Sequence, residues 1–167
     1  MTELTETDDD YEAEKLGPSR AFPPFYVLRT ATYCPECGEA MHVYTLGCAA
    51  FHDAEDSRPV EEFHFLRRTE SVPGQVLALL TAKCPGYYLD QEEGEERPYL
   101  MNHCHCGARL DDDYVHGDVG AAFWPDTPEG FRQFKLFRLP IDEAIPVESS
   151  YMLGGGEYLD IEHAGPW

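Results

Sequence analysis

The chain has few basic residues. Only 12 of its 167 residues are Lys or Arg, against 32 Asp or Glu, and the formal net charge is −20 at pH 7. Proteins that bind a nucleic-acid backbone neutralise its phosphates with clustered Lys and Arg side chains. The charge balance therefore argues against direct nucleic-acid binding. It favours a solvated acidic surface, or a basic protein as the partner.

Long apolar runs are also missing. No stretch of the sequence approaches the roughly 18 apolar residues of a membrane-spanning helix. The first residues, Met1 to Glu6, show no basic segment followed by an apolar one, so we expect no secretory signal. Together these features predict a cytoplasmic protein that crosses no membrane. Its thiols would be reduced there, and a disulfide framework is not expected.

Several motifs of known chemistry are absent. The sequence contains no glycine-rich phosphate-binding loop, no His-Glu-x-x-His, and no His-x-Glu combined with Pro-Cys-x-x-Cys. These patterns are typical of nucleotide-binding proteins, zinc proteases and zinc deaminases, respectively. The sequence therefore predicts none of these three activities.

What the sequence does contain is two close cysteine pairs that are far apart along the chain. They lie in the stretches 34–38 (Cys-Pro-Glu-Cys-Gly) and 103–107 (His-Cys-His-Cys-Gly). In a reducing compartment, clustered cysteines are typical of metal ligands. Two thiolate pairs can meet at one tetrahedral Zn²⁺ with Zn–S bonds of about 2.3 Å. We therefore predict a Zn²⁺ site formed by Cys34, Cys37, Cys104 and Cys106.

The second pair leaves an alternative open. Cys104 and Cys106 are separated by one residue, whereas the usual spacing has two. Counting back three positions from Cys106 reaches His103, so His103 could replace Cys104 as a ligand. Thiolate is the softer ligand for zinc, which favours Cys104. His105 is expected to be a surface neighbour of the site.

The regions around these pairs predict a strand-rich fold of the α+β class. Residues 26–33 and 40–46 are rich in β-forming side chains and flank the first pair, as in a zinc-ribbon hairpin. Further strands are expected at residues 61–68, 99–101 and 131–139. One main helix is expected over residues 71–83, with Ser71 as its N-cap, and a short second helix begins near residues 126–129. The lone cysteines, Cys48 and Cys84, are expected to be buried core thiols.

Three segments are distinguished by composition. Residues 1–20 are acidic and polar and predict a disordered arm. Residues 21–140 form the expected zinc-ribbon-like domain, and residues 141–167 a C-terminal extension interrupted by the glycines at 154–156. Within the domain, three aspartates at 111–113 lie near His116. A carboxylate–histidine pair can be catalytic, but we expect a solvated turn followed by a strand.

One stretch resembles a known group of proteins. It combines Tyr99-Leu100 with Asn102-His103-Cys104 and Cys106-Gly107-Ala108, and Phe123-x-Pro125 follows after an acidic turn. Over residues 30–128 the chain resembles small, uncharacterised bacterial zinc-ribbon proteins with two Cys-x-x-Cys-Gly knuckles. The resemblance implies the same four cysteine ligands and a bacterial origin, and implies no activity. The chain departs from the pattern by the one residue missing between Cys104 and Cys106.

Three functions are compatible with these features. The first is a non-catalytic protein-interaction or regulatory module with a structural Zn²⁺, because four protein ligands leave no coordination position for water. The second is an acidic inhibitor or nucleic-acid mimic that binds a basic protein. The third is a zinc enzyme, which would need three protein ligands and a bound water. We favour the first.

Overall fold

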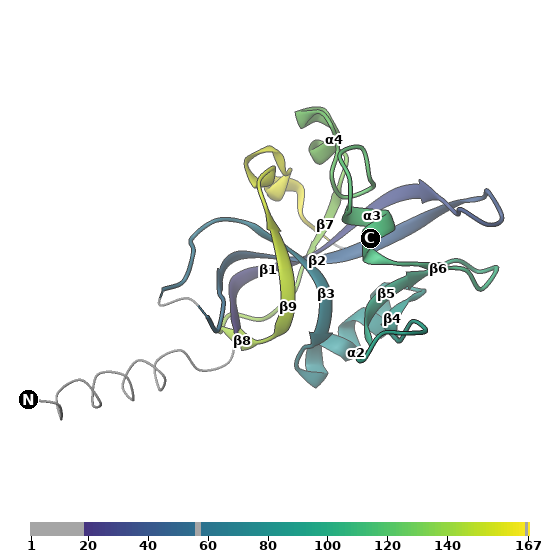
Figure 1. Ribbon diagram of the computed structural model, residues 1–167. Helices are drawn as coiled ribbons and strands as arrows, with labels where there is room; N and C mark the ends of the chain where they lie inside the picture. Colours follow the sequence, from purple (N-terminus) through teal and green to yellow (C-terminus); the bar gives the residue numbers. More distant parts are fainter. Residues whose placement is uncertain (1–18, 56–57, 166) are drawn as a thin grey trace, which may run out of the picture.

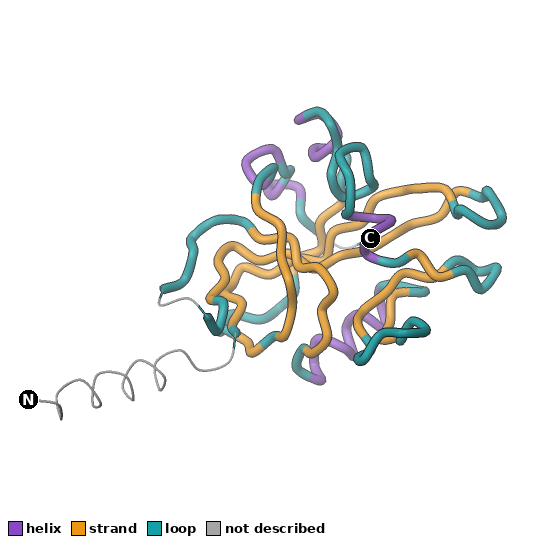
Figure 2. The backbone as a smooth tube through the Cα atoms, in the orientation of Figure 1, coloured by secondary structure: helices purple, strands orange, loops and turns teal. Residues whose placement is uncertain are grey.

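The computed structural model describes residues 19–55, 58–165 and 167, and the structure is α+β and rich in antiparallel strands (Figures 1 and 2). The predicted fold class is thereby confirmed at this level. Residues 1–18 of the expected acidic arm lie outside the described residues. None of the described helices is long and apolar enough to cross a membrane.

The described strands form two sheets. The larger sheet has the order β7-β1-β2-β3-β9, with β8 paired to β1 as well. The smaller sheet has the order β4-β5-β6. The strands of the larger sheet are β1 (Arg20–Tyr33), β2 (Ala40–His52), β3 (His64–Ser71), β7 (Lys135–Arg138), β8 (Ile145–Pro146) and β9 (Glu148–Leu153). Those of the smaller sheet are β4 (Tyr87–Asp90), β5 (Tyr99–His103) and β6 (Arg109–Leu110).

The helices are short. They are α2 (Gly74–Lys83), α3 (Asp112–His116) and α4 (Pro128–Arg132), followed by the 3₁₀ turns η1 (Gly156–Tyr158) and η2 (Ile161–His163). Val76 and Leu80 of α2 are buried in a hydrophobic cluster that also contains residues of both sheets. The predicted main helix and its apolar face are therefore present.

Strands β1 and β2 form a long hairpin that carries the first cysteine pair at its tip (Figure 1). Their register runs from Arg20 opposite His52 to Tyr33 opposite Ala40, with one irregularity between Phe22 and Phe25. The strands expected on both sides of this pair are confirmed. β2 continues six residues beyond the expected end at residue 46, to His52.

The hairpin is buried on both faces, which explains why its length was underestimated. Alternate residues point to opposite faces of a strand. Phe25 and Val27 pack into one hydrophobic cluster, and Tyr26 and Leu28 pack into a second one. Residues 43–48 are consequently all buried. The sequence of such a strand is a continuous apolar run without alternation of apolar and polar residues. The end of the strand is therefore hard to predict from the sequence.

The predicted start of α2 is wrong. Ser71 is the last residue of β3, where it pairs with Glu148 of β9, and it does not cap the helix. The residue that precedes a proline is disfavoured in helical conformation, which separates Ser71 and Val72 from the helix. The first turn instead begins at Pro73, whose carbonyl oxygen accepts a hydrogen bond of 2.9 Å from the amide of Val76.

The prediction for residues 111–116 is also wrong. Helix α3 replaces the expected turn and strand, and the side chain of Asp111 caps it by accepting a 2.8 Å hydrogen bond from the amide of Tyr114. Asp112 and His116 are both buried. They are four residues apart and so lie on the same face of the helix. The run of three aspartates predicted a solvated turn, because the burial of Asp112 depends on a partner elsewhere in the chain, the amide of Arg68.

The segment expected to form one strand over residues 131–139 is divided. α4, capped by the Thr127 hydroxyl, includes Phe131 and Arg132, and only residues 135–138 form β7. The expected start of a short helix near residues 126–129 is confirmed. Phe134 lies between the two elements and is buried in the second cluster.

The segment after residue 140 contributes to the larger sheet. β9 pairs with β3 from Leu153 opposite His64 to Glu148 opposite Ser71. At the C-terminus, the indole of Trp167 packs near Tyr44 and Phe137 and donates a 3.3 Å hydrogen bond to the carbonyl oxygen of Lys83. Residues 145–153 therefore complete the sheet that carries the β1–β2 hairpin.

Candidate metal centre

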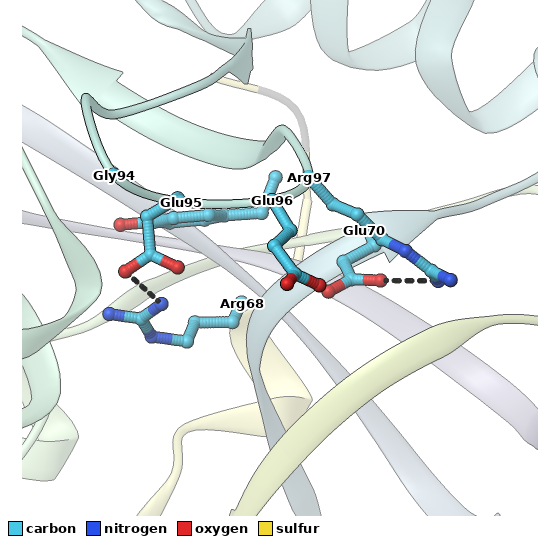
Figure 3. A pocket seen from close by; sticks show the side chains of 7 residues that line it. Arg68, Glu70, Gly94, Glu95, Glu96 and Arg97 are labelled. Atoms are coloured by element: carbon cyan, nitrogen blue, oxygen red, sulfur yellow. Dashed lines mark hydrogen bonds and ion pairs between the residues drawn. The ribbon is translucent and has the colours of Figure 1, made fainter.

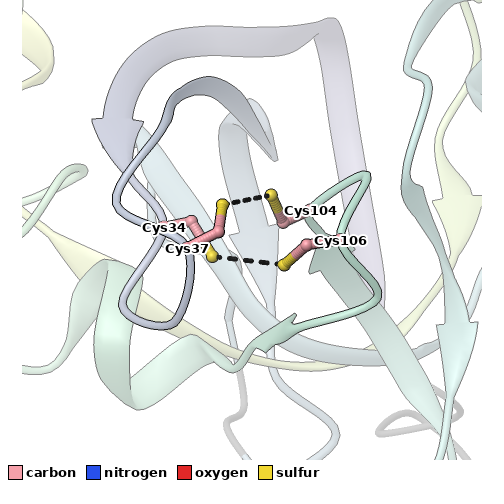
Figure 4. Close-up of side chains that lie close together, drawn as sticks. All are labelled: Cys34, Cys37, Cys104 and Cys106. Atoms are coloured by element: carbon pink, nitrogen blue, oxygen red, sulfur yellow. Dashed lines mark hydrogen bonds between the residues drawn. The ribbon is translucent and has the colours of Figure 1, made fainter.

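The two cysteine pairs lie at the ends of two neighbouring hairpins. The first follows β1, and the second lies in the turn between β5 and β6 (Figure 4). The four Sγ atoms of Cys34, Cys37, Cys104 and Cys106 all lie within 4.8 Å of one another. Two sulfur contacts cross between the hairpins: Cys34 to Cys106 is 3.7 Å and Cys37 to Cys104 is 3.6 Å. The sulfurs predicted to share a site are therefore brought together.

The first turn is closed by its own backbone. The amide of Cys34 donates to the carbonyl oxygen of Glu39 (2.9 Å), and the amide of Gly38 donates to the carbonyl oxygen of Cys34 (3.0 Å). Gly38 has a φ of 75°, which favours glycine. The amide of Glu36 points at the Sγ atom of Cys34 at 3.4 Å. The turn thus presents both sulfurs and directs an amide dipole at one of them.

The second turn is a shortened copy of the first. Here the amide of Cys104 donates to the carbonyl oxygen of Ala108, and the amide of Gly107 donates to the carbonyl oxygen of Cys104, both at 2.9 Å. Gly107 also has a positive φ, of 93°. Each of these two bonds spans one residue fewer than its counterpart in the first turn. The missing residue between Cys104 and Cys106 is therefore absorbed in a tighter turn, and both sulfurs still reach the other pair.

A buried asparagine joins the two hairpins next to the sulfurs. The side chain of Asn102 in β5 accepts a 2.8 Å hydrogen bond from the amide of Tyr44 and donates one of 2.9 Å to its carbonyl oxygen. The side-chain carboxamide therefore pairs with β2 as a backbone peptide group of a neighbouring strand would. Asn102 is 1% exposed. It fixes the position of β5, and hence of Cys104, relative to the first hairpin.

His103 is engaged elsewhere. Its Nδ1 atom lies 2.9 Å from the carbonyl oxygen of Gly86, and its Nε2 atom lies 2.7 Å from a carboxylate oxygen of Asp90. Its ring stacks on Tyr88 with the ring centroids 3.9 Å apart. Hydrogen bonds from His103 and Arg109 lower the pKa of Asp90 to about 2. The structure therefore places Cys104, and not His103, with the other three sulfurs.

His105 links the two turns at the surface. Its Nδ1 atom is 3.6 Å from the Sγ atom of Cys104, and its Nε2 atom is 2.8 Å from a carboxylate oxygen of Glu39 in the first turn. The sequence predicts only that His105 is a neighbour of the site. Its connection to Glu39 depends on the two turns meeting, so no local pattern could have indicated it.

The sulfurs differ in exposure and in electrostatic setting. Cys34 and Cys104 are buried, whereas Cys37 and Cys106 are exposed. The backbone amides of Cys37 and Glu36 point at the sulfur of Cys34 and outweigh the opposing effect of burial, which lowers the pKa of Cys34 to about 6. The thiolate is the form of cysteine that binds metals. At Cys37 a backbone hydrogen bond from Glu39 is outweighed by burial and by the neighbouring sulfurs, which raise its pKa to about 12, and the pKa of Cys106 is raised as well. Before any ion is considered, the charged form is therefore favoured at Cys34 and disfavoured at Cys37 and Cys106.

Cys48 and Cys84 lie outside this cluster. Both are buried, and burial raises the pKa of each thiol to about 12. They are packed in the first hydrophobic cluster, as expected of core thiols.

The pair of Asp112 and His116 also lies outside the cluster. The His116 ring is fully buried, and its Nε2 atom lies 3.2 Å from the hydroxyl of Thr45. Burial lowers the pKa of His116 to about 3 and raises the pKa of Asp112 to about 7. Asp112 accepts a hydrogen bond from the backbone amide of Arg68. The pair is thus part of the packing between α3 and the larger sheet.

A surface pocket beside β3 is lined by charged side chains (Figure 3). Its volume is about 330 Å³, and the loop before β5 forms one side of it. Arg68 pairs with Glu95 and Arg97 pairs with Glu70, each at 3.3 Å. Glu96 is a third carboxylate in the lining, so two arginines face three glutamates, and most of the charge is used in ion pairs within the pocket.

Comparison with known proteins found no matching family, no matching curated protein and no matching solved structure. The resemblance to bacterial zinc-ribbon proteins therefore stays a prediction. What the structure does establish is a four-cysteine cluster that is compatible with a structural metal site.

Proposed function

We propose that Cys34, Cys37, Cys104 and Cys106 hold one structural Zn²⁺, and that the protein is a non-catalytic module for protein interaction or regulation. The observation that carries the proposal is the spacing of the sulfurs. A tetrahedron with Zn–S bonds of about 2.3 Å has edges of about 3.8 Å. The two sulfur contacts between the hairpins, at 3.6 and 3.7 Å, are near this edge length, and all four sulfurs lie within 4.8 Å of one another.

The position of the cluster supports a structural role. The first pair belongs to the larger sheet, and the second belongs to the smaller sheet. An ion bound by all four sulfurs would tie the two sheets together at their tips. It would also leave no coordination position for a water, which a hydrolytic zinc centre requires. The donor set thus favours a structural ion over a catalytic one.

Exposed aromatic side chains near the cluster support an interaction role. Tyr33 precedes Cys34 and is 69% exposed, and the hydroxyl of Tyr114 donates a 2.8 Å hydrogen bond to the carbonyl oxygen of Tyr33. Tyr88, which stacks on His103, is 51% exposed. Tyrosine is enriched at protein–protein interfaces. We propose that a protein partner in a bacterial cytoplasm binds near this end of the molecule.

Native mass spectrometry tests the metal site. We expect one zinc per chain in the wild type and none in the Cys34→Ser and Cys104→Ser variants. The His103→Ala variant should keep the metal, because both ring nitrogens of His103 contact other groups. Cys84→Ser serves as a matched control, since it removes a buried cysteine outside the cluster. A wild type without metal, or loss of metal in His103→Ala, would refute the proposed ligand set.

The acidic composition supports a second candidate, an inhibitor or nucleic-acid mimic that binds a basic protein. The net charge is −20, and Glu93, Glu95 and Glu96 lie in one exposed loop. Electrostatic complementarity would make such binding sensitive to salt. A basic protein recovered with the wild type at low salt should be lost at high salt and with a Glu93→Lys/Glu96→Lys variant. Recovery that is unchanged by both would exclude this mechanism.

A further inference from the structure

We propose that the four-cysteine cluster is also a site of oxidative modification, at which peroxide forms two disulfides, Cys34–Cys106 and Cys37–Cys104, and releases the metal. The inference rests on the proposed function in one respect, namely the released ion. The pairing of the sulfurs is a property of the chain itself. It follows from which sulfurs face one another across the two hairpins.

Two sulfur contacts between the hairpins favour this pairing. The S–S bond of a disulfide is about 2.05 Å long, so each of the pairs at 3.6 and 3.7 Å would have to close by about 1.6 Å. The two contacts use each sulfur once, so that both bonds can form in the same molecule (Figure 4). Four cysteines allow two other pairings. In one of them, Cys104 would be joined to Cys106 across one residue, in a turn that the backbone hydrogen bonds at Cys104 already hold. The other, Cys34–Cys104 with Cys37–Cys106, would join the two buried sulfurs to each other, where peroxide has least access.

The exposure of the sulfurs indicates which cysteine of each pair reacts first. Each cross-hairpin pair combines one exposed cysteine, Cys37 or Cys106, with one buried cysteine, Cys104 or Cys34. In the zinc-bound protein every ligand sulfur would be a thiolate, so peroxide would react first with the exposed sulfur of each pair. The buried sulfur then stands about 4 Å away as the resolving thiol and is itself shielded from the oxidant. This arrangement favours a disulfide over further oxidation of a single cysteine.

The chemistry balances with hydrogen peroxide as the oxidant. The exposed thiolate attacks one peroxide oxygen; an S–O bond forms, the O–O bond breaks, and the leaving hydroxide takes up a proton to become water. The buried thiolate then attacks the resulting sulfenic sulfur; the S–S bond forms and a second hydroxide leaves and becomes water. Each pair of thiols gives up two electrons in forming its disulfide and reduces one peroxide to two waters. The metal keeps its charge and leaves because its thiolate ligands are gone.

The predicted disulfides connect the same elements as the ion. They would join residues separated by 72 and 67 positions in the sequence, across the first and second hairpins. A covalent link that closes a long loop restricts the unfolded chain. Oxidation should therefore release the metal while the sheets remain held together, which would make metal release a reversible signal.

The test uses the full-length, zinc-loaded protein and hydrogen peroxide. We expect loss of one zinc per chain, detected with a colorimetric chelator, and loss of four hydrogens in the intact mass. Cleavage after Glu36 separates Cys34 from Cys37, whereas Cys104 and Cys106 stay in one peptide. Fragmentation of the linked peptides between Cys104 and Cys106 in tandem mass spectrometry should then show Cys34 joined to Cys106 and Cys37 joined to Cys104. Reduction with dithiothreitol in the presence of Zn²⁺ should restore the original mass and the metal.

Three results would overturn the inference. They are disulfides in either of the other two pairings (Cys34–Cys37 with Cys104–Cys106, or Cys34–Cys104 with Cys37–Cys106), sulfinic or sulfonic acid as the main product, and loss of the cooperative thermal transition on oxidation. If the untreated protein contains no zinc, the proposed function fails. The disulfide map of the metal-free chain still decides the pairing, so the two failures can be told apart.

Discussion

At the scale of the single residue, Asn102 shows how a side chain can act as part of the backbone framework. Its carboxamide pairs with both the amide and the carbonyl oxygen of Tyr44, in a position that is almost completely buried. Buried polar groups cost free energy unless they are paired. Loss of the side-chain amide would leave two backbone groups of β2 without partners, directly beside the hairpin that carries Cys34.

We expect the Asn102→Leu substitution to destabilise the protein by about 2–4 kcal/mol, because it leaves two buried backbone groups unpaired. Urea denaturation of the purified proteins measures this free energy. The Gln75→Leu variant, which replaces an exposed amide on α2, should change the stability by less than about 0.5 kcal/mol. Equal effects of the two substitutions would contradict the role assigned to Asn102.

At the scale of the element, α3 is held to β3 through one buried carboxyl group. Asp112 accepts a hydrogen bond from the amide of Arg68, which lies at an irregularity of β3 and has a φ of 47°. Burial raises the pKa of Asp112 to about 7 from its ordinary value of 3.8. The protonated carboxyl group is therefore favoured in the folded state relative to the unfolded state.

This shift gives a prediction for the dependence of stability on pH. The contribution of Asp112 is largest below pH 4 and is lost as the pH rises from 4 to 7, because the folded chain holds a proton that the unfolded chain has released. We expect the stability of the wild type relative to Asp112→Asn to fall by roughly 1 kcal/mol per pH unit between pH 5 and pH 6.5. Urea denaturation over this range measures the difference.

The control for this experiment is Asp113→Asn, since the side chain of Asp113 is 70% exposed. Its difference from the wild type should stay nearly constant with pH. Metal ligation by cysteine also depends on pH, but it affects all three proteins equally and cancels in the comparison. A wild-type and Asp112→Asn difference that does not change with pH would rule out a raised pKa at Asp112.

At the scale of the whole molecule, two hydrophobic clusters lie on opposite faces of the larger sheet, and the sulfur cluster borders the second of them. Cys34 and Cys104 belong to this second cluster, together with Ala108 and Leu110. The proposed ion would therefore act at the margin of a packed core. Its removal would affect the contact between the two sheets as well as the two turns.

We expect complete removal of zinc with a chelator to lower the thermal transition of the reduced protein substantially, because binding to the folded state alone contributes to its stability. Calorimetry with and without chelator, with the residual metal measured in the same samples, tests this. The Cys84→Ser variant should respond as the wild type does. An unchanged transition after complete removal of the metal would exclude a structural role for the ion.

Oxidised and chelated samples should behave differently. Both would lack the metal, but only the oxidised chain would keep a link between the hairpins. A comparison of their thermal transitions therefore separates the effect of the bound ion on stability from the effect of a link between the two hairpins.

Local patterns in the sequence determined several features of this protein. The strands on both sides of Cys34, the short helix capped by Thr127 and the buried face of α2 follow from residue preferences within a few positions. The pairing of two distant cysteine motifs could also be predicted, because four thiols at these spacings have few other uses in a reducing environment. In these cases the deciding interactions are either local or specified by chemistry.

The tertiary structure alone decided the remaining features. Ser71 belongs to β3 because β9 pairs with it, and Asp112 is buried in α3 because the amide of Arg68 lies opposite. His103 is directed toward Asp90, and His105 toward Glu39, only once the strands and turns have met. Each of these outcomes depends on a partner at least 13 residues away for its burial, hydrogen bond or strand pairing. A sequence window records propensity and spacing, but the free energy that selects among these conformations comes from contacts made by the folded chain.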